Sequence, residues 1–543
     1  MSSLKLAVTD RYMNLPVKNN ASKTFIRFYS DESLVREFNI ELTDGEPDFW
    51  VFSDLREYLG QTLEVKLEGY KGKTDLADLI LLSDTIKNRE DIYSEKYRPQ
   101  LQFTCKRGWL NDPNGLVYYK GEYHLFYQHN PYGIKWGNMH WGHAVSEDLV
   151  HWEELEIALY PDELGTMFSG SAIVDHHNTT GFQTGEESPL VLIYTAAGNE
   201  APRSKGVAYT QCLAYSNDRG RTWTKYEHNP VLGNIIGNNR DPKVLWHEPT
   251  QKWVMALYLD KNDFALLTSP DLKEWEKTCD IHFPNGRECP ELFELPVDND
   301  RNQKKWVFWE PKGSYMVGSF DGKTFIQESL VSCNHFGPHY YAAQTWSGIP
   351  EEDGRLIQTA WSRTHLPGMP FNSFLTFPCT LSLRTTPEGL RLCYYPVKEI
   401  EKLHAKLYTY ENMNLNGEKM LQTNIEAELL DLNAEMEVGS ASEIHLLVNG
   451  IQIVYKLLEK RLICQDVSAS FEHKEGKVSF RVLVDRTAIT IFGNGGELYM
   501  PVGIMPNQNT RSVDVFVRGG SARLVSMAIS EMNSCWQAAR EGK

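Results

Sequence analysis

The sequence of 543 residues has no long apolar run, and its basic residues are too few to balance the acidic ones. No stretch approaches the roughly 18 apolar residues that a membrane-spanning helix needs, so we expect no membrane partner. Lysine and arginine number 55 against 72 aspartates and glutamates, which gives a net charge of −17. Because nucleic acid backbones attract basic surfaces, this balance predicts that nucleic acid is not a partner.

The nine cysteines are scattered, odd in number and free of any Cys-x-x-Cys pair. This distribution favours reduced thiols and gives no support for a zinc site, so we predict no metal and no cofactor. The first ten residues lack the apolar segment of a secretory signal. We therefore expect a cytoplasmic protein, although a secreted or periplasmic protein whose signal peptide has been removed would have the same N-terminus.

Apolar residues make up 41% of the chain, an ordinary globular share. The length predicts roughly two to four domains. Short runs of alternating apolar and polar residues occupy residues 25–67 and are broken by glycine-containing turns. This pattern is typical of antiparallel strands. We therefore predict a small β domain over residues 1–92, with the charged residues 87–91 as its linker.

A turn pattern recurs four times, beginning at Ser146, Ser216, Ser269 and Ser319. Each copy has an aspartate two positions after the serine and an aromatic residue four or five positions after the aspartate. We interpret each unit as one antiparallel sheet, in which the aspartate closes a tight turn near the outer strands and the aromatic residue packs beneath it. Strand-like runs follow at 341–361. The sequence therefore predicts a five-bladed β-propeller over residues 93–396.

Val397, Ile400 and Leu403 have helical spacing and predict a short connecting helix. The alternating pattern then returns, most clearly at residues 478–484, and predicts a C-terminal β-sandwich over residues 397–543. The expected fold class is all-β: a five-bladed propeller followed by a sandwich and preceded by a small β domain.

Three acidic residues each stand one or two positions before a proline at the start of a predicted blade: Asp112 in the first, Asp241 in the third and Glu288 in the fourth. The innermost strand of every blade lies beside the propeller axis, so residues far apart in sequence can meet at one mouth. The sequence therefore predicts a cluster of three carboxylates there.

The segments around these acids, residues 109–115 (WLNDPNG), 239–243 (NRDPK) and 287–293 (RECPELF), together resemble the three signature motifs of glycoside hydrolase family 32. This is the family of invertases, inulinases and levanases. Further matches are residues 126–131 (FYQHNP), 136–144 (WGNMHWGHA) and 168–171 (FSGS). The resemblance covers residues 98–395 and continues more weakly into the predicted sandwich. It implies a five-bladed catalytic propeller, in agreement with the turn repeats.

Carried over position by position, the resemblance implies that Asp112 is the nucleophile, Glu288 the general acid/base and Asp241 the transition-state stabiliser. One carboxylate must be ionised to attack the anomeric carbon, while another stays protonated to serve the leaving oxygen. We expect neighbouring acids to push their pKa values apart and so divide these roles. A retaining pair is expected roughly 5 to 5.5 Å apart.

The resemblance also implies supporting residues around the acids. Four polar residues are expected to bind the hydroxyls of the fructosyl unit or orient the acids: Asn111, Gln128, Ser169 and Arg240. Three aromatic residues are expected to form the walls of the terminal-sugar pocket: Trp136, Phe168 and Trp361.

His140 and His143 have no nearby acid or cysteine at ligand spacing, so we interpret them as structural. Cys289 is expected to tune the packing of Glu288.

The sequence departs from the family pattern in places. Glu291 stands where aspartate is usual, which we expect to be mild. His339 stands where many members have an acid, which we expect to alter the surroundings of Glu288 or the leaving-group side. Residues 1–92 lie outside the catalytic match and look like the small extra domain of some bacterial fructan-degrading members. We expect this domain to shape a pocket rim or to mediate assembly.

The resemblance implies a retaining, exo-acting β-fructofuranosidase that acts on sucrose, fructo-oligosaccharides, inulin or levan. Several alternatives stay open at this point: a fructosyltransferase or endo-fructanase of the same fold, a sucrose-6-phosphate hydrolase, a five-bladed arabinanase or xylosidase, and a non-catalytic carbohydrate-binding propeller. The sequence also leaves open a homo-oligomer and the choice between β-2,1 and β-2,6 linkages.

Overall fold

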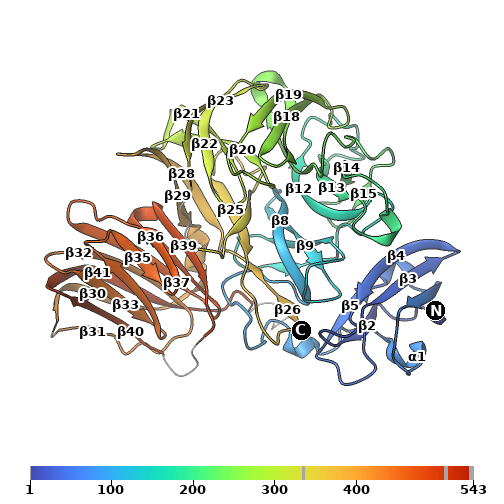
Figure 1. Cartoon of the computed structure of the whole chain (residues 1–543), viewed down its shortest axis with the longest axis horizontal. Helices are drawn as coiled ribbons and strands as arrows, with labels where there is room; N and C mark the ends of the chain where they lie inside the picture. The colour runs from blue at the N-terminus through green and yellow to red at the C-terminus, as the bar shows by residue number, and fades with distance from the viewer. Residues whose placement is uncertain (1, 333–336, 418, 507–510, 537–543) are drawn as a thin grey trace.

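The computed structural model describes residues 2–332, 337–417, 419–506 and 511–536. Three β regions follow one another along the chain, with the N-terminal region and the C-terminal sandwich on different sides of a central propeller (Figure 1). Among the described residues, no helix combines the length and the apolar character needed to cross a bilayer. The predicted all-β fold class is confirmed.

The N-terminal region is a pair of small sheets packed around one apolar core. The first sheet has the order β1 (Ser2–Ala7), β6 (Thr62–Glu68), β3 (Thr24–Ser30), β4 (Ser33–Ile40). The second has the order β5 (Phe49–Asp54), β2 (Tyr12–Val17), β7 (Leu81–Ser83). Strand β4 is an edge strand of the first sheet. The short helices of this region are η1 (Arg56–Tyr58), α1 (Leu76–Leu79) and η2 (Arg89–Asp91), the last of which lies in the predicted linker.

The propeller has five blades, each with four antiparallel strands in chain order. The first two blades are β8 (Gly108–Tyr119), β9 (Glu122–Asn130), β10 (His140–Ser146) and β11 (Glu153–Glu154), then β12 (Thr166–Val174), β13 (Leu190–Ala197), β14 (Thr210–Ser216) and β15 (Thr224–Lys225). The third and fourth are β16 (Arg240–His247), β17 (Lys252–Asp260), β18 (Asp263–Ser269) and β19 (Glu276–His282), then β20 (Glu291–Val297), β21 (Asp300–Trp309), β22 (Tyr315–Phe320) and β23 (Phe325–Val331). The fifth is β24 (Tyr341–Thr345), β25 (Leu356–Ser362), β28 (Cys379–Thr386) and β29 (Gly389–Pro396).

Short elements complete the ring. Strand β26 (Phe371–Asn372) pairs in parallel with β8 and so ties the segment between the second and third strands of the fifth blade to the first blade. Strand β27 (Phe374–Leu375) pairs with β25, and 3-10 helices η3 (Pro202–Ser204) and η4 (Glu248–Thr250) lie between strands. The first strands β8, β12, β16 and β24 contact their neighbours in adjacent blades, so they surround the axis as predicted.

The repeated turns occupy the place that the sequence predicted for them. Each joins the third and fourth strands of one of the first four blades. In the second blade, Asp218 accepts hydrogen bonds from the backbone N–H groups of Arg221 and Thr222 at 3.0 and 2.9 Å. The indole N–H of Trp223 donates to the Gly220 carbonyl at 3.1 Å. The local hydrogen bonds therefore explain why the spacing repeats.

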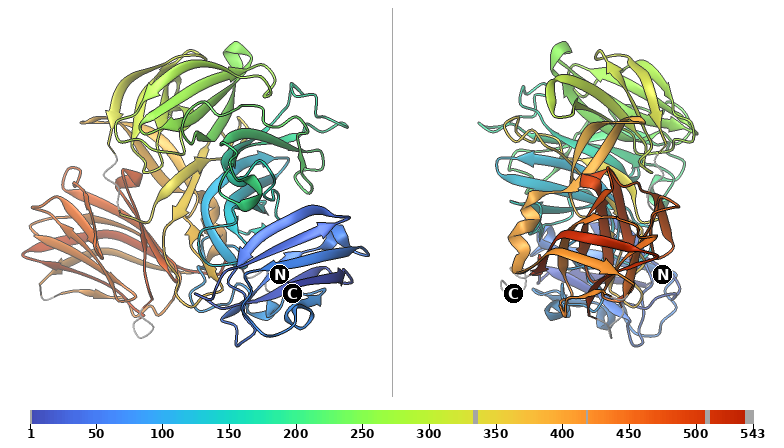
Figure 2. Two further views of the ribbon diagram at one scale, coloured as in Figure 1. Left: turned by 45° about the vertical axis from the view of Figure 1, so that its right-hand side comes forward. Right: turned by 90° about the vertical axis from the view of Figure 1, so that its left-hand side faces the viewer.

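The C-terminal region is a sandwich of two six-stranded sheets (Figure 2). One sheet has the order β30 (His404–Asn416), β41 (Ser521–Met532), β32 (Leu430–Glu437), β37 (Lys477–Val484), β38 (Ala488–Gly493), β39 (Leu498–Gly503). The other has the order β31 (Leu421–Gln422), β40 (Val513–Arg518), β33 (Glu443–Val448), β34 (Ile451–Lys456), β35 (Arg461–Cys464), β36 (Val467–Ser470). The 3-10 helix η6 (Asn494–Gly496) joins β38 to β39.

The predicted connecting helix is present as a 3-10 helix, η5 (Lys398–Leu403). Its Ile400 and Leu403 side chains are buried, which accounts for the apolar spacing seen in the sequence. The predicted domain limits at 92/93 and 396/397 fall beside η2 and η5, and as limits of independent folding units they stay predictions.

Candidate active site

Irregular backbone at the start of the inner strands lies beside the axis. The pairing register shifts between Leu110 and Pro113 in β8 and between Arg240 and Lys243 in β16. Asp241, Cys289 and Ala342 have φ angles of 62°, 48° and 51°. Left-handed φ values are uncommon outside glycine, and bulges re-aim side chains that would otherwise alternate across the sheet.

The three predicted acids converge around Cys289, the residue that follows Glu288. Its sulfur lies 3.8 Å from an Asp112 oxygen and 3.5 Å from an Asp241 oxygen. Its backbone N–H donates to the same Asp241 oxygen at 3.0 Å. The first, third and fourth blades therefore bring their acids to one point, and Asp112, Asp241 and Cys289 line one small cavity there.

Asp112 is held by neighbours from its own strand and from β12. The Ser169 hydroxyl donates to one carboxylate oxygen at 2.9 Å, and the Asn111 amide donates to the other at 3.1 Å. Burial raises the pKa of Asp112 from 3.8 to about 7, and the nearby charges of Glu288 and Asp241 add to the effect. In the free site, the proposed nucleophile therefore holds a proton readily.

Asp241 is fixed through its backbone as well as its side chain. Its N–H donates to the Thr195 hydroxyl at 3.0 Å, and the Arg240 Nε lies 3.6 Å from its carboxylate. Burial raises the pKa of Asp241 to about 6 although Arg240 lowers it, and the charge of Glu288 raises it further. The pKa values of both Asp112 and Asp241 are therefore raised by burial and by the nearby acids.

Glu288 has the most polar surroundings of the three acids. Arg240 donates to its Oε2 from Nε at 3.2 Å and from Nη2 at 2.5 Å, and the Tyr341 hydroxyl donates to Oε1 at 2.6 Å. Burial raises the pKa of Glu288, but Arg240 and the Tyr341 hydrogen bond outweigh burial and lower it below 4.5. The pKa values of the acids do lie apart, but Arg240 and Tyr341 lower that of Glu288, so in the free site the direction is opposite to the predicted division of roles.

The polar residues predicted to support the acids lie at different depths. Asn111, Ser169 and Arg240 touch the acids directly. Gln128 is only 2% exposed and donates to the Met167 carbonyl at 2.8 Å. With the Asn114 amide in the orientation that satisfies both of its groups, Gln128 also donates to it, and Asn114 donates to Ser169 at 3.2 Å. Gln128 therefore supports Ser169 through Asn114, and the contact of Gln128 with substrate stays a prediction.

The predicted aromatic walls form two groups. Trp136 is 50% exposed and packs edge-to-face on Phe168, with ring centroids 6.0 Å apart. Trp361 packs edge-to-face on Trp109 at 5.8 Å and on Tyr341 at 6.2 Å. The first group adjoins Ser169 along the chain and the second contacts the Glu288 partner Tyr341, so aromatic faces border the acids on two sides.

Sequence reasoning missed Tyr341, which holds Glu288, and Lys243, which lines the same small cavity as Asp112 and Asp241. Tyr341 was interpreted only as part of a strand, because nothing in its own segment indicates that it faces Glu288. Lys243 forms a buried ion pair with Glu291, which is 1% exposed, and donates to the Thr345 carbonyl at 2.7 Å. The partners of Glu291 are thus Lys243 and Thr345, and the expected mildness of this departure from the family pattern stays a prediction.

The other singled-out residues have structural surroundings. Burial lowers the pKa of His339, and the charge of Asp466 in the sandwich opposes this shift. The expected influence of His339 on Glu288 stays a prediction. His143 contacts the His124 ring nitrogen at 3.1 Å, and burial lowers the pKa of His140 to about 3. No group of three or more potential metal ligands occurs among the described residues.

Family models match both the propeller and the sandwich. The family model described as "Glycosyl hydrolases family 32 N-terminal domain" matches residues 102–396, and "Glycosyl hydrolases family 32 C terminal" matches residues 399–531. Residues 1–101 lie outside both matches.

Individual relatives agree with the family models. A levanase of Bacillus subtilis is 38% identical over 82% of this chain and 72% of its own length. An extracellular exo-inulinase of Aspergillus niger is 31% identical over 82% of this chain and 96% of its own length. The crystal structure of exo-inulinase from Aspergillus awamori superposes with a TM-score of 0.74 at 29% identity, covering 82% of this chain and 100% of that one. The chain belongs to glycoside hydrolase family 32.

Proposed function

We propose that this chain is a retaining, exo-acting β-fructofuranosidase that hydrolyses terminal β-D-fructofuranosyl linkages in sucrose, fructo-oligosaccharides, inulin or levan. The observation that carries the proposal is the convergence of Asp112, Asp241 and Glu288 around Cys289. Family membership supports the same substrates, because the relatives include a levanase and an exo-inulinase. The cytoplasmic location and a homo-oligomer stay predictions.

The geometry supports a double displacement. Ionised Asp112 attacks the anomeric carbon of the fructosyl unit and forms a covalent ester while the bond to the leaving oxygen breaks. Glu288 donates its proton to that oxygen. As a carboxylate, Glu288 then takes a proton from the water that hydrolyses the ester, which restores Asp112. Asp241 is anchored by the Cys289 N–H and is positioned to accept hydrogen bonds from sugar hydroxyls.

Substrate binding must relocate the proton within the acid cluster. In the free site the pKa of Asp112 is raised to about 7, whereas the pKa of Glu288 is lowered. Sugar hydroxyls that donate to Asp112 and Asp241 stabilise their ionised forms. The leaving oxygen, in turn, gives a proton on Glu288 an acceptor. The occupied site therefore favours the arrangement that the reaction needs: the three acids hold one proton in total, and that proton is on Glu288.

Product analysis tests the proposal directly. The protein is incubated with sucrose, kestose, inulin and levan, and the products are separated by chromatography, with Glu288→Gln as the control. We expect fructose as the only small product from inulin and levan, lost in the control. Proton NMR at early times should show the β anomer of fructose first, since a double displacement retains configuration.

Each alternative gives a different result. Longer oligosaccharides would show endo cleavage, products larger than the substrate would show fructosyl transfer, and an inverted first anomer would overturn the double displacement. Sugar binding by the wild type without any turnover would show a carbohydrate-binding propeller. No reaction with the four substrates would overturn the proposal and direct the search to phosphorylated sucrose and arabinose-based substrates.

A further inference from the structure

Trp136, one of the predicted walls of the sugar pocket, lies on a propeller segment that also packs into the N-terminal domain. Residues 131–139 connect β9 to β10 of the first blade and carry Trp136. Two side chains of this segment, Tyr132 and Ile134, are buried in the apolar core of the N-terminal domain. Tyr132 is only 1% exposed. The N-terminal domain therefore completes its own core with a piece of the propeller.

The contact at Tyr132 is specific in geometry. Its ring stacks on Phe38 with centroids 3.6 Å apart and an interplanar angle of 13°. Its hydroxyl lies 3.3 Å from the Ser53 hydroxyl on β5, so both ends of the side chain have a partner in the N-terminal domain. A side chain held by stacking and by a hydrogen bond has few alternative positions.

A second contact lies two residues beyond Trp136. The Asn138 amide accepts from the Asn39 N–H at 2.9 Å and donates to the Asn39 carbonyl at 2.7 Å. Asn39 is on β4, the edge strand, so the Asn138 side chain satisfies backbone groups that a further strand would otherwise bind. On the other side of Trp136, the Lys135 ammonium pairs with Glu41 at 2.9 Å. Contacts from the N-terminal domain thus bracket Trp136.

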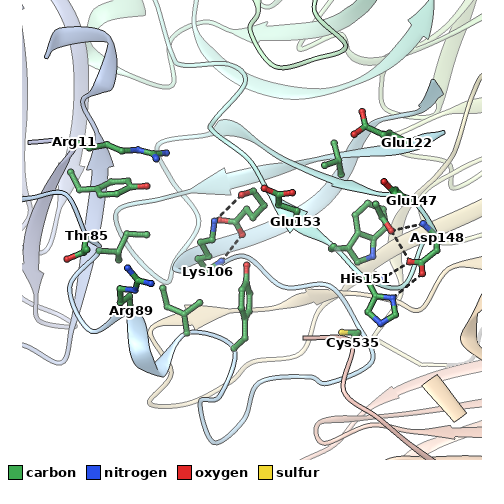
Figure 3. Close-up of a pocket in the computed structure, with 18 of the residues that line it drawn as sticks. Arg11, Thr85, Arg89, Lys106, Glu122, Glu147, Asp148, His151, Glu153 and Cys535 are labelled. Carbon is green, nitrogen blue, oxygen red and sulfur yellow. Dashed lines mark hydrogen bonds and ion pairs between the residues drawn. The ribbon is translucent and has the colours of Figure 1, made fainter. Parts of the chain in front are cut away.

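These contacts stand out because the N-terminal domain does not lie flat on the first blade. A cleft of about 920 Å³ separates the two, with Arg11 and Thr85 on one side and Glu147 and Asp148 on the other (Figure 3). None of the three active-site acids lines this cleft. The domain contacts the propeller outside this cleft, at residues 131–139 and where Arg36 stacks on the Tyr160 ring at 4.3 Å.

We propose that the N-terminal domain is a working part of the substrate site, because it fixes residues 131–139 and thereby holds Trp136 against Phe168 at the rim of the pocket. The inference rests on the proposed function, since it treats Trp136 as a surface for the terminal sugar. Tyr132 and Asn138 are positioning residues, which act through Trp136. A held ring binds more tightly than a free one, because the binding-competent position is already populated. The domain therefore sets affinity for the fructosyl chain end, and the acids set turnover.

Two interface variants test the proposal from opposite sides, Phe38→Ala in the N-terminal domain and Asn138→Ala in the propeller. The matched control is Glu64→Gln, which removes a partly exposed ion pair with Lys66 at 3.0 Å on β6. We expect KM for kestose and inulin to rise about tenfold in both interface variants, with kcat within about twofold, as expected when ground-state and transition-state binding weaken together. The control should match the wild type.

A double-mutant cycle separates positioning from general destabilisation. Trp136→Ala alone should raise KM about tenfold, but it should add less than about twofold in the Phe38→Ala background, because the ring is already misplaced there. Independent, multiplying effects would overturn the proposal. So would an unchanged KM in both interface variants.

Hydrogen exchange gives a readout that does not need turnover. Peptides covering residues 131–139 should exchange about tenfold faster in Asn138→Ala than in the wild type, while peptides from β16 stay unchanged. Equal exchange would overturn the positioning role. If the wild type releases no fructose, the proposed function fails, but faster exchange at 131–139 would still establish the contact; failure of the two ideas is therefore distinguishable.

Discussion

Aspartates at the outer turns and at the inner strands of the same propeller have opposite surroundings. At the outer turn of the fourth blade, the backbone N–H groups of Thr324 and Lys323 lower the pKa of Asp321. At the inner end of the first blade, burial and two neighbouring acids raise the pKa of Asp112 to about 7. The outer aspartate is satisfied by its own turn, whereas the inner one is crowded by acids from other blades. Crowding of like charges marks the site, and satisfied hydrogen bonds mark the scaffold.

The two regions therefore contribute to stability with opposite signs. A lowered pKa means that the ionised outer carboxylate stabilises the fold, and this contribution is lost as the pH falls. A raised pKa means that the folded state binds the proton more tightly, so ionised Asp112 destabilises the fold. Its cost appears as the pH rises from about 4 to about 7. The following predictions sharpen this contrast or break it.

Asp112→Asn should have the largest effect, and in two directions. Loss of the proposed nucleophile should lower kcat on the order of 10⁴-fold or more. The same change removes a buried carboxylate, so the free energy of unfolding at pH 7 should rise by about 1–3 kcal/mol, measured by urea denaturation. The gain should shrink towards pH 4, where the wild-type carboxyl is protonated in the folded state. A variant as inactive as predicted but less stable at pH 7 would contradict the crowding argument.

The pH profile of kcat/KM should reflect the joint titration of Asp112, Asp241 and Glu288. The reactive form holds one proton among the three acids, so activity should peak between the pKa values of about 6 and about 7. Above this window the last proton leaves, and below it a second proton binds and removes a needed charge. Each limb should approach about tenfold per pH unit. A flat profile between pH 5 and 8 would contradict the assigned acids.

Much of this contrast could be predicted from sequence, because structures formed by residues close in sequence need particular residue types at particular spacings. The turn at Asp218 needs a serine, an aspartate and an aromatic residue at a nearly fixed spacing, and so the first four blades could be located. The acids could be found because each stands beside a proline at a blade start. The Tyr341 contact with Glu288 joins positions 53 apart in sequence, and the Asn138 contact with Asn39 joins positions 99 apart. No spacing rule covers such contacts.

The direction of the pKa shifts could not be predicted for the same reason. Sequence indicates that acids converge, but it does not indicate which of them Arg240 contacts. The structure places this cation and the Tyr341 hydroxyl on Glu288, which leaves the proton with Asp112 in the free site. The division of roles is therefore completed by substrate and not by the empty site.

Tyr341→Phe should give an intermediate effect. A hydrogen bond to a charged carboxylate is worth about 1.5–3 kcal/mol, so kcat/KM should fall roughly 10- to 100-fold as Glu288 loses an orienting partner. Because the hydroxyl lowers the pKa of Glu288, its removal should move the alkaline limb of the kcat profile, which reports the substrate-bound site with the proton on Glu288, to higher pH. Reduced activity with an unmoved limb would mean that Tyr341 only fills space. Tyr340→Phe, at the preceding residue, is the matched control, since it removes a hydroxyl that donates to Gln358 and not to Glu288.

Asp218→Ala should have the smallest effect on activity, which makes it the counterpart of the nucleophile variant. The alanine removes acceptors for the N–H groups of Arg221 and Thr222 and for the Thr222 hydroxyl at 2.6 Å. The free energy of unfolding should fall by about 1–2 kcal/mol, because the turn loses the hydrogen bonds that close it. Unlike Asp112→Asn, this variant should lose most relative to the wild type at neutral pH and least in acid, while kcat stays unchanged. If its kcat fell with its stability, outer turns and inner acids would be coupled through the blade, and the separation of scaffold from site would not hold.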